Sequence, residues 1–305
     1  MPNNFSKVKT STGQGDKLLF EKENFTRGMP LSLSVRVAEA YHNKKRSSMT
    51  IAELIKLAEQ YGYKALCLRA SQVGIHSTAK EIRKMGDMVR KAELRVSMIT
   101  GDFAVPLNDQ NGPEGLRNIK PYLDLAEAFN AKLIRICMMK TEDVVWAQRA
   151  CDEARERGIR LAHQSHCASL FETVEGSLEV LRAVGRENFG MIYEPANWMI
   201  SGEGYGPDAI ERIKDYIFNV YVQNHRLNPD GDTEVRTWRK GPVGVDNIGL
   251  WKNGGVDFTA VFSTLHRIKY SGFVTVHQAF ENVMSISEAV RRSSHYLSEL
   301  TRLPI

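Results

Sequence analysis

The chain has 305 residues, 42% of them apolar and 25% charged, and its 41 basic and 36 acidic side chains give a formal net charge of +5. These proportions are those of globular proteins and exclude a disordered, fibrous or coiled-coil chain. Apolar stretches fall short of the ~18 residues of a membrane helix, and no basic run resembles a nucleic-acid site. We therefore expect neither a membrane nor a nucleic acid as partner.

The first 28 residues differ in composition from the rest of the chain. Residues 1–28 are polar, rich in Ser, Thr, Asn, Gly and Lys, and predict an N-terminal arm ahead of one domain over residues 29–305. The N-terminus lacks the apolar core of a signal peptide, and the four Cys residues are far apart without a CxxC pair. Reduced thiols and a cytoplasmic location are the corresponding expectations.

From residue 31 onward, short apolar runs alternate with amphipathic segments. The runs have the length and composition of strands and lie at 31–37, 64–70, 95–101, 131–138, 159–166, 189–197, 217–225 and 272–280. The segments between them repeat apolar residues at three- and four-residue steps, as helices do, at 50–62, 78–93, 116–130, 141–158, 175–185, 208–216 and 257–272. A further amphipathic segment, 285–303, ends the chain.

Eight strands that each feed a helix predict an α/β fold, a single (β/α)8 TIM barrel. An open doubly wound sheet has the same alternation. It is disfavoured because no GxGxxG follows the first run and no GxxxxGK[ST] occurs, which also predicts that no nucleotide cofactor is bound. The long Gly- and Asp-rich segment 226–256, between the seventh strand and its helix, has a length more typical of a functional lid than of a connector.

The carboxyl ends of barrel strands carry the chemistry of this architecture, so the polar residues there are candidates. Polar strand ends also occur in any barrel, but several neighbouring strands ending in His or Glu form a stronger signal. Successive side chains of a strand point to opposite faces, so if Gln164 faces the barrel interior, His163 faces the helices and His166 faces inward again. The candidates for substrate binding are Arg69, Asn197, Trp198, Gln223, His225 and Arg226, and those for catalysis are Glu194, His277 and His163.

Several motifs together resemble a known superfamily. They are HQSHCASLFETVEGSLEVLRAVG, YEPANW, NVYVQNHRL, GGVDFTAVFSTLHRIKYSG and FVTVHQAFE, in this order and spacing. Over about residues 31–300 the chain resembles the sugar phosphate isomerase/epimerase superfamily with its xylose isomerase-like barrel. The resemblance implies an isomerase or epimerase that acts on a sugar.

The resemblance also implies a divalent metal, held by a Glu, an acid, a His and a Glu on the last four strands. Those positions fall on Gln164, Glu194, Tyr221 and His277, of which only Glu194 keeps its chemical type. Glu194, His277, Gln164 and His166 can still form a site for Mn, Zn or Fe. A hydrogen-bonded network without an ion is the alternative.

With or without a metal, these residues suit proton abstraction next to a carbonyl. Glu194 is the expected base if apolar neighbours raise its pKa, and His277 is the alternative. Arg69, Arg135 or Arg226 can stabilise an enolate or clamp a carboxylate or phosphate. Elimination from a keto-glycoside and a non-catalytic sugar-binding barrel are the other functions considered, and by analogy we expect a homo-oligomer or a small partner subunit.

Overall fold

The computed structural model describes residues 28–40, 43–100, 112–281 and 283–302. Apart from Gly28, the predicted N-terminal arm lies outside the described residues. No helix within them is long and apolar enough to cross a membrane.

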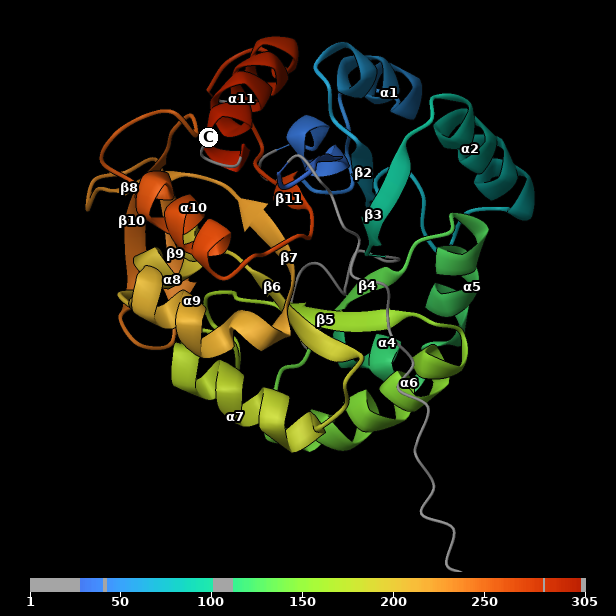
Figure 1. Cartoon of the computed structure of the whole chain (residues 1–305), viewed down its shortest axis with the longest axis horizontal. Helices are drawn as coiled ribbons and strands as arrows, with labels where there is room; N and C mark the ends of the chain where they lie inside the picture. The colour runs from blue at the N-terminus through green and yellow to red at the C-terminus, as the bar shows by residue number, and fades with distance from the viewer. Residues whose placement is uncertain (1–27, 41–42, 101–111, 282, 303–305) are drawn as a thin grey trace, which may run out of the picture.

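Eight parallel strands close into a barrel in the order β1-β11-β7-β6-β5-β4-β3-β2, which confirms the predicted TIM barrel (Figure 1). Every neighbouring pair around the ring is parallel. The barrel strands are β1 (Leu31–Ser34), β2 (Ala65–Leu68), β3 (Arg95–Ile99), β4 (Leu133–Ile136), β5 (Arg160–Gln164), β6 (Phe189–Tyr193), β7 (Ile217–Val222) and β11 (Val274–Val276).

The helices form a ring outside the barrel, as Figure 1 shows, and bury their apolar faces against it. They are α1 (Ile51–Gln60), α2 (Ala79–Lys91), α4 (Gly112–Arg117), α5 (Lys120–Ala128), α6 (Val144–Glu156), α7 (Val174–Val184), α8 (Pro195–Ser201), α9 (Pro207–Ile213), α10 (Phe258–Arg267) and α11 (Ile286–Thr301). Short 3-10 turns lie at Val35–Ala38, Thr141–Asp143 and Lys214–Tyr216.

Local sequence signals fix several helix ends. Thr50 with Glu53 and Thr78 with Glu81 form capping boxes, in which each side chain bonds the other residue's backbone N–H at the start of α1 and α2. At the end of α7, Gly185 takes a left-handed conformation with φ of 57° that a side chain would disfavour.

Several predicted boundaries are wrong: the strand runs extend beyond the strands of the structure, and the single helix predicted over 116–130 is two helices, α4 and α5. The first run ends as a strand at Ser34 and continues as a 3-10 turn, and the sixth ends at Tyr193 because Pro195 begins helix α8. Proline suits the first turn of a helix, where its missing N–H costs nothing.

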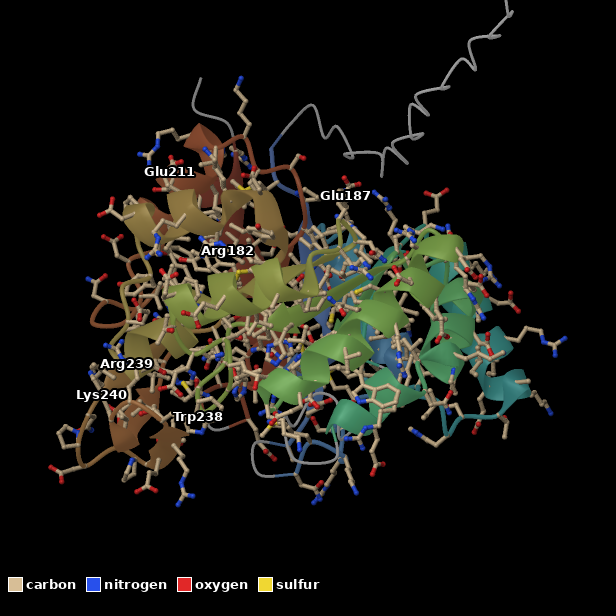
Figure 2. The ribbon with its side chains drawn as sticks, turned by 90° about the horizontal axis from the view of Figure 1, so that it is seen from below. Arg182, Glu187, Glu211, Trp238, Arg239 and Lys240 are labelled. Atoms are coloured by element: carbon tan, nitrogen blue, oxygen red, sulfur yellow. The ribbon has the colours of Figure 1, made fainter. Side chains whose placement is uncertain are left out.

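The segment 226–256, expected to be a lid, largely folds as a small antiparallel sheet. Its strands are β8 (His225–Leu227), β9 (Thr233–Thr237) and β10 (Gly241–Asn247), in the order β8-β10-β9. Figure 2 shows Trp238, Arg239 and Lys240 together at the β9–β10 turn. This turn is attached to the barrel because the backbone N–H groups of Trp238 and Arg239 both donate to the Glu172 carboxylate at 2.9 Å.

The barrel interior is filled in layers, because inward-facing residues recur every second position along each strand. Near the amino ends, Ser32 bonds Ser97 at 2.7 Å and Thr275 donates to Asn219 at 2.9 Å. The middle layer is apolar apart from the Tyr221 hydroxyl, and consists of Cys67, Met98, Leu133, Ala162, Ile192 and Tyr221. Two residues further along these strands, the carboxyl-end layer is polar, and it forms the candidate site.

Candidate active site at the carboxyl end of the barrel

Side chains two positions apart on a strand face the same side, so the residues two positions after the middle layer also face the barrel interior. These residues form most of the site. Cys67 leads to Arg69, Leu133 to Arg135, Ala162 to Gln164 and Ile192 to Glu194. His277 directly follows β11 and stacks on Tyr221 of the middle layer. All five of these end residues are buried, with exposed fractions of 7% or less.

Glu194 is the most enclosed carboxyl group of the site, with an exposed fraction of 0%. Its Oε2 accepts a hydrogen bond from the Gln164 amide, and its backbone N–H donates to Ser165 Oγ at 2.7 Å. Its Oε1 has no hydrogen-bond partner among the described residues. Burial raises the pKa of Glu194 to about 8, although the Gln164 bond and the charges of Arg135 and Lys44 oppose the shift. The carboxyl group is therefore mostly protonated at neutral pH.

His277 lies flat against Tyr221, with ring centroids 3.8 Å apart and an angle of 8° between the ring planes. Its Nδ1 is 3.0 Å from the hydroxyl oxygen of Ser34 on the neighbouring strand. Burial lowers the pKa of His277 well below its usual value, and nearby positive charges lower it further. The imidazole is therefore neutral at pH 7 and serves as a hydrogen-bonding group rather than as a cation.

A second carboxylate of the site, Glu39, was not among the predicted residues. Its Oε1 accepts hydrogen bonds from Arg69 Nε at 2.8 Å and from Ser71 Oγ at 2.7 Å, and its Oε2 lies 3.5 Å from Arg36 Nη1. Burial alone would raise the pKa of Glu39, but Arg69, Arg36 and Ser71 outweigh it and hold the pKa below the usual value. No sequence pattern points to Glu39, because it follows a 3-10 turn in which strand periodicity has already ended.

Lys44 is the other residue that sequence reasoning missed. Its residue surface is only half-buried. Burial of its ammonium group and the positive charges of Arg36, Arg69 and Arg135 lower its pKa to about 7. The three successive basic residues at 44–46 in the loop after the first strand were the available signal, but a basic loop is usually a solvated one.

His163, Asn197 and Trp198 are placed outside this layer. His163 stacks on Phe171 with centroids 4.3 Å apart, and its two ring nitrogens lie 2.6 and 3.3 Å from backbone carbonyl oxygens. This is the outward orientation that strand alternation predicts. Asn197 donates to the Ser165 carbonyl at 2.8 Å, and the indole N–H of Trp198 donates to the Phe171 carbonyl at 2.9 Å. These contacts hold the β5 and β6 loops together.

The predicted substrate-binding residues that follow β7 do not lie together in the site. Gln223 is half-buried, two residues beyond the inward-facing Tyr221. His225 and Arg226 belong to β8, where Arg226 forms an exposed ion pair with Asp246 at 2.6 Å. Burial lowers the pKa of His225 to about 4. None of the described hydrogen bonds or ion pairs joins His225 or Arg226 to Glu194 or His277.

The divalent metal that the sequence suggested stays a prediction, because the described residues give only partial support for its site. No group of three or more His, Cys, Asp or Glu side chains suited to a metal occurs in the described part of the chain. The Gln164 amide N–H already occupies one oxygen of Glu194, and four basic residues act on His277. His166, the remaining predicted ligand, is half-buried, with Nδ1 2.7 Å from the Cys167 carbonyl oxygen.

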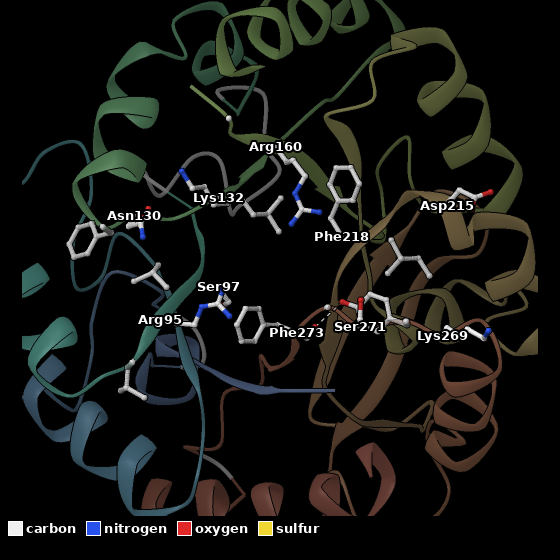
Figure 3. A pocket seen from close by; sticks show the side chains of 18 of the residues that line it. Arg95, Ser97, Asn130, Lys132, Arg160, Asp215, Phe218, Lys269, Ser271 and Phe273 are labelled. Atoms are coloured by element: carbon white, nitrogen blue, oxygen red, sulfur yellow. Dashed lines mark hydrogen bonds between the residues drawn. The ribbon is translucent and has the colours of Figure 1, made fainter. Parts of the chain in front are cut away.

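A cavity of about 1000 Å³ lies at the opposite, amino end of the strands. Figure 3 shows Arg95, Arg160, Phe218 and Phe273 around it, and the guanidinium of Arg160 lies 4.6 Å from the centroid of the Phe218 ring. None of the predicted site residues lines this cavity.

Comparisons with known proteins agree with this architecture. A family model described as a xylose isomerase-like TIM barrel matches residues 55–299. A search among curated proteins found no match.

Several solved structures are similar to this chain in fold. The probable 3-DHS dehydratase AsbF from Bacillus anthracis has a TM-score of 0.67 and 14% identity, covering 88% of this chain and 99% of its own. A xylose isomerase-like TIM barrel protein from Mycobacterium smegmatis in complex with magnesium has a TM-score of 0.65 and 14% identity, over 90% and 96%. D-allulose 3-epimerase from Methylomonas sp. in complex with D-allulose has a TM-score of 0.63 and 15% identity, over 90% and 97%. At these identities the likeness concerns the fold.

Proposed function

The chain belongs to the family of xylose isomerase-like TIM barrels, and on that premise we propose that it is an enzyme that abstracts a proton next to a carbonyl of a carbohydrate or sugar-derived substrate. Isomerisation or epimerisation is the proposed outcome. The similar folds of an epimerase that binds D-allulose and of a probable dehydratase are consistent with chemistry of this kind. A homo-oligomer or a small partner subunit stays a prediction.

The observation that carries the proposal is the buried carboxyl group of Glu194. A general base is most effective when its pKa lies near the working pH, and burial brings the pKa of Glu194 to about 8. The ionised form, a minority at pH 7 that grows as the pH rises towards 8, is the form that accepts the proton. Its Oε1, without a partner in the described structure, is available to a substrate C–H. His277 is the weaker candidate for the base, because its pKa is lowered well below the usual value.

Proton transfer to Glu194 leaves the C–H electron pair on the substrate, where it forms an enolate as the carbonyl electrons move to oxygen. The oxyanion needs a nearby positive charge or hydrogen-bond donor. Arg69 and Arg135 carry such charges, and the charge of Arg135 acts on both Glu194 and His277. A proton delivered to the opposite face of the same carbon, by a donor on that side, gives an epimer. Return of the proton from Glu194 to the neighbouring carbon, with the hydroxyl proton passing between the two oxygens, gives the isomer.

The first step is tested by hydrogen exchange. The protein is incubated in deuterated water with a panel of ketoses, keto-sugars and their acids, and loss of the α-proton signal is followed by NMR. We expect exchange with at least one compound, and a loss of exchange of about a hundredfold or more in Glu194→Gln, because removal of a general base costs about 10²–10⁴-fold. Glu211→Gln is the control, since Glu211 lies on α9 and pairs with Arg267.

The outcomes separate the alternatives. Exchange that Glu194→Gln leaves intact contradicts the role of Glu194, and no exchange with any compound favours the non-catalytic sugar-binding barrel. Exchange followed by release of a β-substituent identifies elimination, which begins from the same enolate.

A further inference from the structure

The cavity at the amino end of the barrel lies apart from the candidate active site. It has a volume of about 1000 Å³, and the first residues of several barrel strands line it. Towards the barrel interior it ends at Ser97, whose hydroxyl bonds Ser32 at 2.7 Å. The apolar layer around Tyr221 lies between this cavity and the side chains of Glu194 and His277. Its volume is that of a site for a small organic molecule.

Phe218 reaches the cavity because strand β7 is irregular. Between Ile217 and Asn219, β7 has one residue more than the stretch of β6 that it pairs with, and Phe218 is that residue. Asn219 bonds Thr275 inside the barrel, so regular alternation would turn Phe218 outward. Its ring packs against the interior layer instead. An extra residue of this kind re-aims a side chain, and such bulges are common beside functional sites.

Gly190 on the neighbouring strand leaves the space that the Phe218 ring occupies. A Cβ at Gly190 would lie 2.7 Å from two carbon atoms of this ring. Glycine inside a strand often marks a close approach of this kind. The bulge in β7 and the glycine in β6 together hold an aromatic ring at the amino mouth of the barrel.

The Phe218 ring in turn holds Arg160. The guanidinium carbon of Arg160 lies 4.6 Å from the centroid of this ring, and that of Arg95 lies 5.4 Å from the centroid of Phe273. Both are cation–π distances. Figure 3 shows the two guanidinium groups pointing toward the middle of the barrel mouth. Stacking fixes the plane of Arg160, and its N–H groups form a planar fork that matches a carboxylate.

Arg160 is half-buried, and none of the described hydrogen bonds or ion pairs joins its guanidinium to an acid. Burial lowers the pKa of Arg160, and Tyr270 opposes this shift. Glu211 and Asp215 also line the cavity, but Glu211 pairs with Arg267 at 3.1 Å and Asp215 is exposed. A half-buried guanidinium without a carboxylate partner favours an anion in the space before it.

Apolar side chains face the same space. Phe129, Leu133, Phe218 and Phe273 are among the residues that line the cavity. A molecule that reaches Arg160 with a charged group therefore places the rest of its body against rings and an aliphatic side chain. Burial of apolar surface there adds to the affinity in proportion to the area removed from water.

We propose that the amino-end cavity is a binding site distinct from the candidate active site, and that it takes an amphiphilic carboxylate. The carboxylate lies on Arg160, and an alkyl chain or an aromatic ring lies against Phe218 and Phe273. The proposal is independent of the proposed function, because none of the residues assigned to proton abstraction lines this cavity.

The test is equilibrium binding to the intact protein by calorimetry, with ligands that vary the charged head and the apolar body separately. Octanoate and naphthoate carry both, octanol lacks the charge, and acetate lacks the body. We expect octanoate or naphthoate to bind about tenfold or more tightly than octanol and acetate, because the charged hydrogen bond and the apolar burial both contribute. The tighter of the two acids shows whether the cavity prefers a chain or a ring.

Variants locate the binding. Arg160→Met is expected to weaken the preferred acid about tenfold or more while leaving the affinity for octanol within a few-fold. Lys132→Met serves if Arg160→Met does not fold, because Lys132 is an exposed residue of the cavity lining, and it is expected to weaken the acid several-fold. Arg291→Met is the matched control, because Arg291 is an exposed arginine on α11 that pairs with Glu288.

Equal affinity for octanoate and octanol, or an acid affinity that neither Arg160→Met nor Lys132→Met changes, overturns the proposal. Acid binding that changes in Glu194→Gln but not in Arg160→Met places the ligand at the carboxyl end and overturns it as well. Acid binding that is lost in Arg160→Met, in a protein without α-proton exchange, supports this site and contradicts the proposed enzyme alone.

Discussion

The buried carboxyl group of Glu194 leads to a prediction about stability that does not require a substrate. Its pKa is about 8 in the folded protein, against an ordinary value of 4.5. The folded state therefore holds the proton more tightly than the unfolded chain does. Between these two pH values the folded state binds more protons, so the contribution of Glu194 to stability is present at low pH and is lost as the pH rises. Glu194→Gln, which stays neutral, escapes this loss.

The magnitude follows from the shift. One pH unit corresponds to about 1.4 kcal/mol when one proton separates the two states. We therefore expect the free energy of unfolding of Glu194→Gln, minus that of the natural protein, to increase by about 1.4 kcal/mol per pH unit from pH 4.5 upward. The gain should reach roughly 3 kcal/mol at pH 7 and level off above pH 8.

Urea unfolding at half-unit pH steps measures this difference, with circular dichroism as the signal and a common slope for both proteins. Other titrating groups cancel, because only the difference between the two proteins is used. A difference that stays constant from pH 5 to pH 8 would refute the reasoning, since Glu194 would then titrate as an ordinary carboxyl group.

The pH dependence of stability that we expect from Glu39 has the opposite sign to that expected from Glu194. Glu39→Gln leaves Arg69 and Arg36 buried without their carboxylate, so we expect a loss of about 3–5 kcal/mol at pH 7. That loss should shrink as the pH falls through the lowered pKa of Glu39, and a loss that grows in acid would contradict the ion pair. His163→Ala removes the ring stacked on Phe171, and should lower the free energy of unfolding by about 2–4 kcal/mol in urea titrations; a loss below about 1 kcal/mol would argue against a packing role. Trp198→Phe removes the bond to the Phe171 carbonyl and should cost about 1–3 kcal/mol, visible as a lower urea midpoint, whereas an unchanged midpoint would contradict it. Gly190→Ala would place a Cβ 2.6 Å from the Tyr216 carbonyl oxygen and 2.7 Å from the Phe218 ring, so a loss of about 1–3 kcal/mol is expected in thermal unfolding, and an equally stable variant would show that the strands can separate there.

The barrel was predictable because its determinants are local. Strand runs and helix segments differ in the period of their apolar residues, and eight such pairs in sequence leave few architectures to choose from. The same local logic predicted that His163 would face away from the barrel, and its stacking on Phe171 has this orientation. Even the local errors have local causes, since Pro195 ended a predicted strand by starting a helix.

The candidate site was predictable only in part. Strand ends indicated Glu194, Gln164, His277 and Arg69, because all of them follow inward-facing positions. Arg226 follows the same kind of run, yet the chain turns there into the β8–β10–β9 sheet and pairs it with Asp246. The spacing of apolar residues does not predict where a loop folds back.

Residue order and hydrophobic spacing thus determined which side chains stand at the carboxyl end of the barrel. Their protonation and their partners were decided by the closed ring, which joins Glu39 to Arg69 across 30 residues and brings charges from three separate segments to act on His277. Charge interactions depend on distance through space and on exclusion of water, and both exist only once the strands have closed around them.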